Sequence, residues 1–386
     1  MSVTPLEALP LETLRRRSST KWRTHPHDVL PMFVAETDFP LAEPIREALA
    51  EAVAIGDTGY TPPDPGLRDV FAAFAARRYG WEVDPARVDW TGDVMMAVVE
   101  VLRGVIAPGD EVVVTPPVYP PFFFCVEEAG GVPRSVPLAA TGAGWSLDLA
   151  GIEAALAAGA RAVLLCNPHN PTGTVHSRET LARLAAIARR YGAVVVSDEI
   201  HAPLAQPGTG FTPFLAAGED AAEVGYAITS SSKAFNLAGL KCALIVTAAA
   251  HTTRVVRGLP REVEWRTGLL GAIATRAAFA PASDAWLDAL LARLDENRHL
   301  LAALLTEHLP EARFVVPDAG FLGWIDLSAY GWGDDPAEAV LHGARVALQR
   351  GPDFGAGGLG HARINFGCGP DVLREAVARI GALARA

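Results

Sequence analysis

The alternation of short apolar runs with helical stretches constrains the fold of this chain more than any other feature. Parallel strands need long crossover connections, which are usually helices, so such alternation predicts a mostly parallel sheet covered by helices on both faces. We therefore expect an α/β protein. The predicted strands are Glu111–Thr115, Arg161–Cys166, Ala193–Val196, Gly225–Thr229 and Ala243–Thr247. The predicted helices between and around them are Leu67–Tyr79, Val94–Ile106, Thr180–Tyr191 and Arg266–Phe279.

The pattern changes in the last third of the chain. A long helical pattern from Ser283 to His308 precedes two short apolar runs, 314–316 and 321–326, and a final helix near Val372–Leu383. A chain of 386 residues exceeds the size that one core usually serves. We expect an N-terminal segment (1–45) that joins a small α+β domain (283–386), beside a large domain (46–282) that binds the ligand.

Composition excludes several classes of function. The 33 basic and 44 acidic residues give a net charge of −11, which disfavours nucleic acid, and the run Arg15–Arg17 is interpreted as a solvated face. No apolar run is long enough to span a membrane, and residues 1–20 lack the apolar stretch of an export signal. The cysteines lack metal-ligand spacing, so we expect no metal and a reducing cytoplasm. They are Cys125, Cys166, Cys242 and Cys368.

Lysine is unusually scarce. Among the 33 basic residues only Lys21, Lys233 and Lys241 are lysines, and arginine supplies the rest. An amine can lose its proton and attack a carbonyl, which a guanidinium cannot do in a protein. Each surviving lysine is thus a candidate for imine chemistry, although codon bias with chance survivors remains the alternative, especially for Lys21.

Polar motifs follow three successive predicted strands. The segments are 167–173 (Asn-Pro-His-Asn-Pro-Thr-Gly), 197–201 (Ser-Asp-Glu-Ile-His) and 230–233 (Ser-Ser-Ser-Lys). In a doubly wound sheet, ligands collect beyond the carboxyl ends of the strands. An amide, a carboxylate and an amine should therefore meet at one edge.

This trio suits pyridoxal phosphate (PLP). Asp198 can face the pyridine nitrogen and keep it protonated, while Asn170, with or without His201, can donate to the ring oxygen. Taken singly, each feature has a structural alternative, since Asp198 could be a helix cap and Lys233 an exposed lysine. The phosphate needs backbone N–H groups, a helix N-terminus and hydroxyls. Candidates for that cup are Gly92, Asp93, Val94, Ser230, Ser232 and Lys241.

The motifs at 167–173 and 197–201, with the run from Ser231 to Leu240, resemble those of fold-type I PLP enzymes, the class I/II aminotransferases. More narrowly, the chain resembles cystathionine β-lyases of the MalY/PatB type over nearly its whole length, from Lys21 to the final helix. Motifs that carry this narrower resemblance are 30–40 (Leu-Pro-Met-Phe-Val-Ala-Glu-Thr-Asp-Phe-Pro), 59–61, 118–122 and 363–366.

The resemblance implies roles for individual residues. Lys233 is expected to be the Schiff-base lysine and general base, Asp198 the partner of the pyridinium, and Asn170 the donor to the ring oxygen. Tyr119 is expected to stack on the ring and take part in catalysis. An ordinary core aromatic is the alternative for Tyr119.

The resemblance also implies a substrate clamp and a partner subunit. Arg363 is expected to hold the substrate α-carboxylate by a bidentate fork, with Ala35 and Asn170 beside the substrate. Tyr60 is expected to reach the phosphate of the other subunit, which implies a homodimer with shared active sites and gives Tyr60 a catalytic role. For Tyr60, too, the alternative is an ordinary core aromatic.

Some positions depart from the narrower pattern. Glu36 and Thr37 stand where Asp-Met is usual, Phe33 replaces a common Trp, and 93–95 (Asp-Val-Met) replaces a run usually rich in Val and Pro. An acidic side chain would repel a phosphate, so we expect Asp93 to point away or to cap a helix and leave only its N–H for the ligand. These departures bear on the substrate more than on the cofactor.

The expected function is β-elimination from an L-amino acid substrate with sulfur at Cβ, cystathionine or a related cysteine S-conjugate, which yields a thiol, pyruvate and ammonia. Transamination is the alternative, since it shares the early steps and differs in returning the proton to C4′ of the cofactor. A biosynthetic lyase for a bulky cysteine conjugate is a third possibility. A regulator without turnover would not need intact Lys233, Asp198 and Arg363. We also expect no fused DNA-binding domain, since the sequence shows no room for one before the N-terminal segment.

Overall fold

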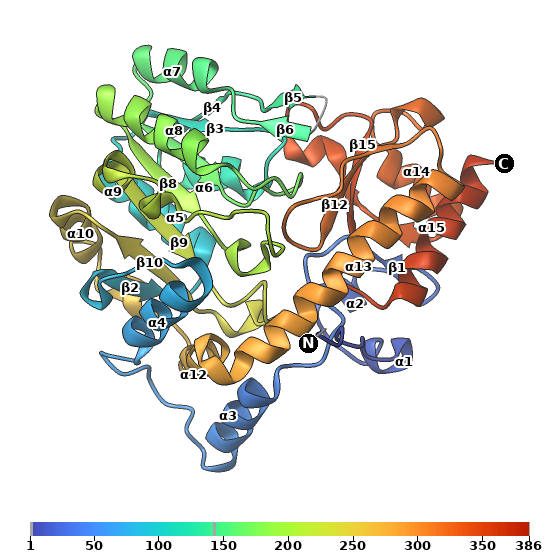
Figure 1. Ribbon diagram of the computed structural model, residues 1–386, viewed down its shortest axis with the longest axis horizontal. Helices are drawn as coiled ribbons and strands as arrows, with labels where there is room; N and C mark the ends of the chain where they lie inside the picture. Colours follow the sequence, from blue (N-terminus) through green and yellow to red (C-terminus); the bar gives the residue numbers. More distant parts are fainter. Residues whose placement is uncertain (1–2, 142–143, 386) are drawn as a thin grey trace.

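The computed structural model of this protein describes residues 3–141 and 144–385. A seven-stranded sheet in the order β2-β10-β9-β8-β7-β3-β4 forms its larger part (Figure 1). Six strands run in one direction, and β10 is antiparallel to both of its neighbours. The strands are β2 (Val88–Thr91), β3 (Glu111–Val114), β4 (Val132–Ser135), β7 (Ala162–Cys166), β8 (Val194–Asp198), β9 (Gly225–Thr229) and β10 (Ala243–Thr247).

The mostly parallel α/β sheet confirms the predicted fold class. All five predicted strands are present, with ends shifted by no more than two residues. The prediction missed both edge strands, β2 and β4. In β4 the sequence Val-Pro-Arg-Ser is largely exposed, and in β2 Asp89 interrupts the apolar run, so neither has the apolar pattern of a buried strand.

Helices cover both faces of this sheet because the strand residues that point up and those that point down are both apolar. In β3, Val112 and Val114 pack in a core with α5 and α6, whereas Val113 between them joins the core on the opposite face. The helices of this part are α3 (Glu43–Ala54), α4 (Leu67–Tyr79), α5 (Val94–Val105), α6 (Pro121–Glu128), α7 (Leu149–Ala157), α8 (Arg178–Arg190), α9 (Glu219–Val224), α10 (Ala250–Arg257), α11 (Glu262–Trp265) and α12 (Leu269–Phe279).

One predicted helix is shorter than expected. The pattern at 266–279 predicted a single helix, but the N–H of Thr267 bonds back to the Glu264 carbonyl and closes the short helix α11, so α12 begins only at Leu269. A local capping residue explains a second shifted boundary. The Ser177 hydroxyl caps α8 by accepting from the N–H of Thr180, which places its start at Arg178 rather than at the predicted Thr180.

The last third of the chain builds a four-stranded antiparallel sheet in the order β11-β12-β15-β14. The long helix α13 runs diagonally from α12 toward the C-terminal elements, where α15 packs against it (Figure 1). These elements are α13 (Asp284–His308), β11 (Arg313–Phe314), β12 (Leu322–Asp326), α14 (Pro336–Ala344), β13 (Val346–Ala347), β14 (Gln349–Arg350), β15 (His361–Asn365) and α15 (Pro370–Ala384).

The N-terminal segment lies against this last third. Its strand β1 (Leu30–Pro31) pairs in parallel with β13, and the N–H of Leu6 bonds to the Ala289 carbonyl of α13. Two short helices, α1 (Leu11–Leu14) and α2 (Thr20–Arg23), precede β1. The domain limits 1–45, 46–282 and 283–386 stay predictions.

Over residues 3–141 and 144–385, no helix combines the length and the apolar character that crossing a membrane would require.

Candidate active site

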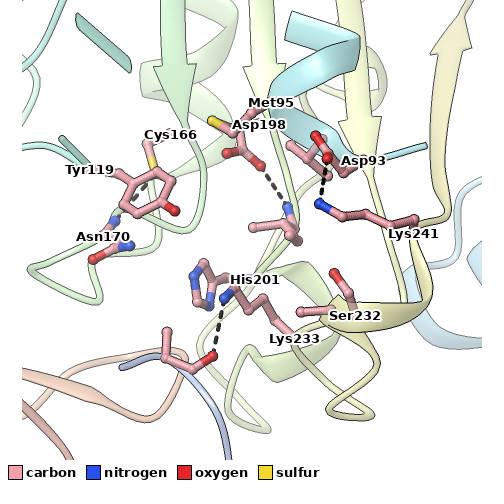
Figure 2. Close-up of a pocket in the computed structure, with 14 residues that line it drawn as sticks. Asp93, Met95, Tyr119, Cys166, Asn170, Asp198, His201, Ser232, Lys233 and Lys241 are labelled. Atoms are coloured by element: carbon pink, nitrogen blue, oxygen red, sulfur yellow. Dashed lines mark hydrogen bonds and ion pairs between the residues drawn. The ribbon is translucent and has the colours of Figure 1, made fainter. Parts of the chain in front are cut away.

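Three neighbouring parallel strands, β7, β8 and β9, bring their carboxyl ends to one edge of the large sheet. A cavity of about 220 Å³ opens there, and Figure 2 shows the side chains around it. It is the place where loops leave the strands, as a doubly wound sheet requires. The lining residues are Ala35, Asp93, Val94, Met95, Tyr119, Cys166, Asn170, Asp198, Ile200, His201, Ser232, Lys233, Ala238 and Lys241.

Lys233 is the amine of this cavity. Its Nζ donates a hydrogen bond to the carbonyl of Ala35, 3.0 Å away (Figure 2). Burial, and after it the neighbouring Arg363 cation, lower the pKa of Lys233 to about 8. Near neutral pH, Lys233 is therefore the nucleophilic free amine in a much larger fraction of the molecules than an ordinary lysine would be.

Two consecutive acidic residues, Asp198 and Glu199, lie at the carboxyl end of β8, and only Asp198 faces the cavity. Oδ1 of Asp198 accepts from the N–H of Ile200 at 3.0 Å, and burial raises the pKa of Asp198 to about 7. Glu199 turns away and accepts from the N–H of Phe214 and the hydroxyl of Ser197. Asp198 is thus an acid poised to hold either a proton or a charge, according to what lies opposite.

Arg363 and Asn170 form a buried pair beside the cavity. Nη1 of Arg363 donates to Oδ1 of Asn170 at 3.0 Å, and Nη2 donates to the Phe33 carbonyl at 2.9 Å. The guanidinium lies over the ring of Phe354, 5.1 Å from its centroid, and burial lowers the pKa of Arg363 to about 10. Among the described residues, Nε of Arg363 finds no hydrogen-bond partner. A buried cation with a free donor suits a carboxylate ligand.

The N-terminus of α5 lies at the opposite end of the cavity. Oδ1 of Asp93 caps the helix by accepting from the N–H of Met96 at 2.8 Å, which confirms the expectation that this acid caps a helix. Its Oδ2 lies 2.8 Å from Nζ of Lys241. This end therefore combines a helix N-terminus with a lysine, a combination that attracts an anion.

Tyr119 and His201 also line the cavity. Burial raises the pKa of Tyr119, so the phenol stays protonated. Burial lowers the pKa of His201 to about 3, and the cations Lys233 and Arg363 act in the same direction. His201 is accordingly a neutral imidazole at physiological pH.

Not every predicted residue reaches the cavity. The Ser230 hydroxyl donates to the Cys242 carbonyl at 2.6 Å, so it is engaged inside the protein. Gly92 is absent from the lining, and a Cβ there would come within 2.8 Å of the Arg266 carbonyl, so this glycine allows a close backbone approach. Tyr60 is 87% exposed, with its ring edge-on to Trp265 at 5.8 Å, away from the cavity of its own chain.

The departures around residue 36 lie beside Lys233. Oε2 of Glu36 accepts from the Ser19 hydroxyl at 2.6 Å, and its charge acts to raise the pKa of Lys233. The Thr37 hydroxyl is buried without a partner in the described part of the chain. Glu36 is thus a second carboxylate acting on the lysine, besides Asp198.

Sequence reasoning missed four lining residues: Met95, Cys166, Ile200 and Ala238. Cys166 carried a signal because it directly precedes the motif 167–173, and Ile200 carried one because it lies inside the motif 197–201. Met95 and Ala238 also lay in segments that the sequence singled out, 93–95 and 231–240, although neither residue was given a role of its own. Within residues 3–141 and 144–385, no three His, Cys, Asp or Glu side chains are grouped to hold a metal ion.

The comparisons with known proteins agree with this geometry. The family model described as aminotransferase class I and II matches residues 28–380. The chain is 36% identical to cystathionine beta-lyase of Corynebacterium glutamicum, over 97% of this chain and 98% of the relative. It is 35% identical to cystathionine beta-lyase PatB of Bacillus subtilis, over 92% of each.

A solved structure shares the whole fold. The PLP-bound C-S lyase from Staphylococcus hominis superposes with a TM-score of 0.87 at 25% identity, covering 96% of this chain and 97% of that one. This chain belongs to the aminotransferase class I and II family.

Proposed function

We propose that this protein is a PLP-dependent carbon–sulfur β-lyase. Its substrate is L-cystathionine or a related L-cysteine S-conjugate. With water, cystathionine yields homocysteine, pyruvate and ammonia. The observation that carries the proposal is the meeting of Lys233, Asp198 and Asn170 at three adjacent strand ends around one cavity, with Arg363 bonded to Asn170. The names of the relatives in Corynebacterium and Bacillus support the same reaction.

The residues present fit PLP. Lys233 offers a buried amine that can bind an aldehyde, and Asp198 offers a carboxyl group to a pyridine nitrogen. Lys241, Ser232 and the backbone at Val94 suit the phosphate, because they combine a cation, a hydroxyl and a helix N-terminus. When bound, PLP supplies an electron sink that stabilises negative charge at the substrate Cα.

Gly92 and Ser230 would serve the phosphate less directly. Gly92 lets the chain before α5 pack closely, and Ser230 holds its own loop through the Cys242 carbonyl and the N–H of Ser232. Asp93 contributes its cap and orients Lys241 by the ion pair. Its carboxylate opposes the phosphate charge, so the net attraction at this end is weaker than the lysine alone would give.

Lys233 is the base in this proposal. Its Nζ removes the Cα proton of the substrate, and the low pKa of the group makes the free amine available for that step near neutral pH. Asp198 holds a proton or a charge against the pyridine nitrogen. Tyr119 would lie on the ring face and His201, as a neutral imidazole, would assist at the ring oxygen.

Arg363 and Asn170 orient the substrate. Nε of Arg363 has no partner, so a carboxylate can bind the guanidinium beside the bond to Asn170. Because Oδ1 of Asn170 accepts from Arg363, the N–H groups of its amide remain for the ring oxygen. The carbonyls of Ala35 and Phe33 lie on the same side, where they accept hydrogen bonds from Lys233 and Arg363, respectively.

Transamination is the second candidate, because the family includes aminotransferases and every residue named above would serve it equally well. One experiment separates the two. Purified protein with PLP is mixed with L-cystathionine, and pyruvate and free thiol are assayed together with the absorbance of the cofactor. Stoichiometric pyruvate and thiol support the lyase. Conversion of the cofactor to its amino form without pyruvate would replace the lyase by the aminotransferase. The same assay with bulkier cysteine S-conjugates as substrates tests the third possibility, a biosynthetic lyase.

We further propose that the protein works as a cytoplasmic homodimer in which Tyr60 enters the partner's active site. The exposed rings of Tyr60 and Trp265, which contact each other, support this arrangement, because exposed apolar side chains that group together mark interaction surfaces. The four cysteines are free and buried, in keeping with a reducing compartment. Light scattering of the holoenzyme tests the dimer, and a monomer at micromolar concentration would contradict it.

A further inference from the structure

Residues 33–37, called the strap from here on, pass the cavity at Ala35. Each of the five strap carbonyls accepts a hydrogen bond from a side chain elsewhere in the chain. A short segment held at every carbonyl has little freedom to move. The donors are Arg363 to Phe33, Asn365 to Val34, Lys233 to Ala35, Asn365 and Lys21 to Glu36, and Asn236 and Arg17 to Thr37.

Two of these donors, Lys233 and Arg363, are the groups that the proposed reaction uses. When Lys233 is bound to the cofactor, the Ala35 carbonyl loses its donor. A substrate carboxylate likewise competes with the Phe33 carbonyl for Arg363. The strap must then keep its place through the remaining contacts, which lie at Val34, Glu36 and Thr37.

One of these remaining contacts, made by Asn236, joins the strap to the loop that carries Lys233. It follows Lys233 by three residues, and its amide bonds both backbone groups of Thr37. Oδ1 accepts from the N–H of Thr37 at 3.1 Å, and Nδ2 donates to its carbonyl at 3.2 Å. The backbone of Asn236 has a φ of 57°, in the left-handed region that most residues avoid and asparagine tolerates.

We propose that Asn236 is a positioning residue that fixes the Ala35 carbonyl relative to Nζ of Lys233. Loop and strap are bonded twice, at Lys233 to Ala35 and at Asn236 to Thr37, and only the second pair persists while the lysine is engaged. When the amine is released, one of its N–H groups returns to the Ala35 carbonyl. Its lone pair is then directed at the Cα proton. This inference rests on the proposed role of Lys233 as the base, and it holds for a lyase and an aminotransferase alike.

The test is exchange of the Cα proton of L-alanine in D₂O, catalysed by the PLP-loaded protein and followed by NMR. Alanine has no leaving group, so the assay measures the base step alone. Asn236→Gly keeps the left-handed backbone and removes both bonds to Thr37. We expect the maximal exchange rate to fall by about tenfold or more, because small displacements of a reacting group are costly, while half-saturation by alanine changes less than about twofold.

Hydrogen–deuterium exchange of the backbone is the second readout. In Asn236→Gly the amides of residues 34–38 should exchange faster, since Thr37 loses its acceptor. Asn236→Asp keeps an acceptor for the N–H of Thr37 and loses the donor to its carbonyl, so its strap exchange should be intermediate. Arg345→Gly is the matched control, because Arg345 also has a φ of 57° and lies at the end of α14; its alanine exchange should equal that of the wild type.

Alanine exchange at the wild-type rate in Asn236→Gly would overturn the proposal, even if the strap amides exchange faster. A slower alanine rate without faster strap exchange would overturn it too, because Asn236 would then act by another route. If the wild type exchanges alanine but releases no pyruvate from S-conjugates, the lyase falls and the inference on Asn236 stands.

Discussion

The low pKa of Lys233 predicts how loading of the cofactor depends on pH. Burial and the Arg363 cation lower this pKa from 10.5 to about 8. At about pH 7.5, roughly a quarter of the lysine would be free amine, against about one part in a thousand for an ordinary lysine. Only the free amine attacks the aldehyde, so the rate rises with pH, passes its midpoint at about 8 and then levels off.

The assay is rapid mixing of PLP with cofactor-free protein across a pH series, followed by the visible absorbance of lysine-bound PLP. The same series with Nα-acetyl-lysine serves as the reference, because dividing by its rates removes the titration of PLP itself. The ratio of the two rates should be greatest near neutral pH and should shrink above the midpoint.

Two substitutions test the stated causes separately. Arg363→Gln removes a cation that lowers the pKa of Lys233, so the midpoint should move to higher pH. Glu36→Gln removes a carboxylate that raises it, so the midpoint should move to lower pH. A wild-type midpoint near that of free lysine, or no movement in either variant, would refute the reasoning.

Three further substitutions have defined outcomes. Lys233→Ala removes the amine, so the visible absorbance with PLP should vanish and pyruvate release should fall by at least about a thousandfold. Arg363→Lys loses the planar fork and its contact with Phe354, so kcat/KM for the amino acid should fall by about a hundredfold in steady-state assays, and an unchanged value would exclude Arg363 as the clamp. Asp93→Asn keeps a helix cap and removes an acid beside the phosphate, so the Kd for PLP, measured by equilibrium dialysis, should fall severalfold. A higher Kd would contradict the account of this end of the cavity.

Much of the site could be predicted because its chemistry lies at strand ends. Asp198 ends β8, Asn170 follows β7 and Lys233 follows β9, and parallel strands carry these groups to the same edge. The apolar runs indicated the strands. The scarcity of lysine left three candidate amines, and the place of Lys233 in a polar motif after a strand separated it from the other two. Local pattern and topology were sufficient for this part.

Other features depend on contacts between distant segments. No local pattern shows that Ser230 is engaged by the Cys242 carbonyl, or that Glu199 turns inward while Asp198 faces the cavity. The strap illustrates the same limit, since Asn236 and Thr37 are 199 residues apart in sequence. Edge strand β4 could not be predicted because it buries little apolar surface.

The central claim is best tested by mixing the yellow PLP-loaded protein with L-cystathionine and measuring pyruvate, thiol and the visible absorbance in one sample. The account predicts release of pyruvate and homocysteine in equal amounts over many turnovers, with the absorbance of lysine-bound PLP restored when substrate is exhausted. A protein that stays colourless with PLP, or that forms the amino form of the cofactor and no pyruvate, would contradict it.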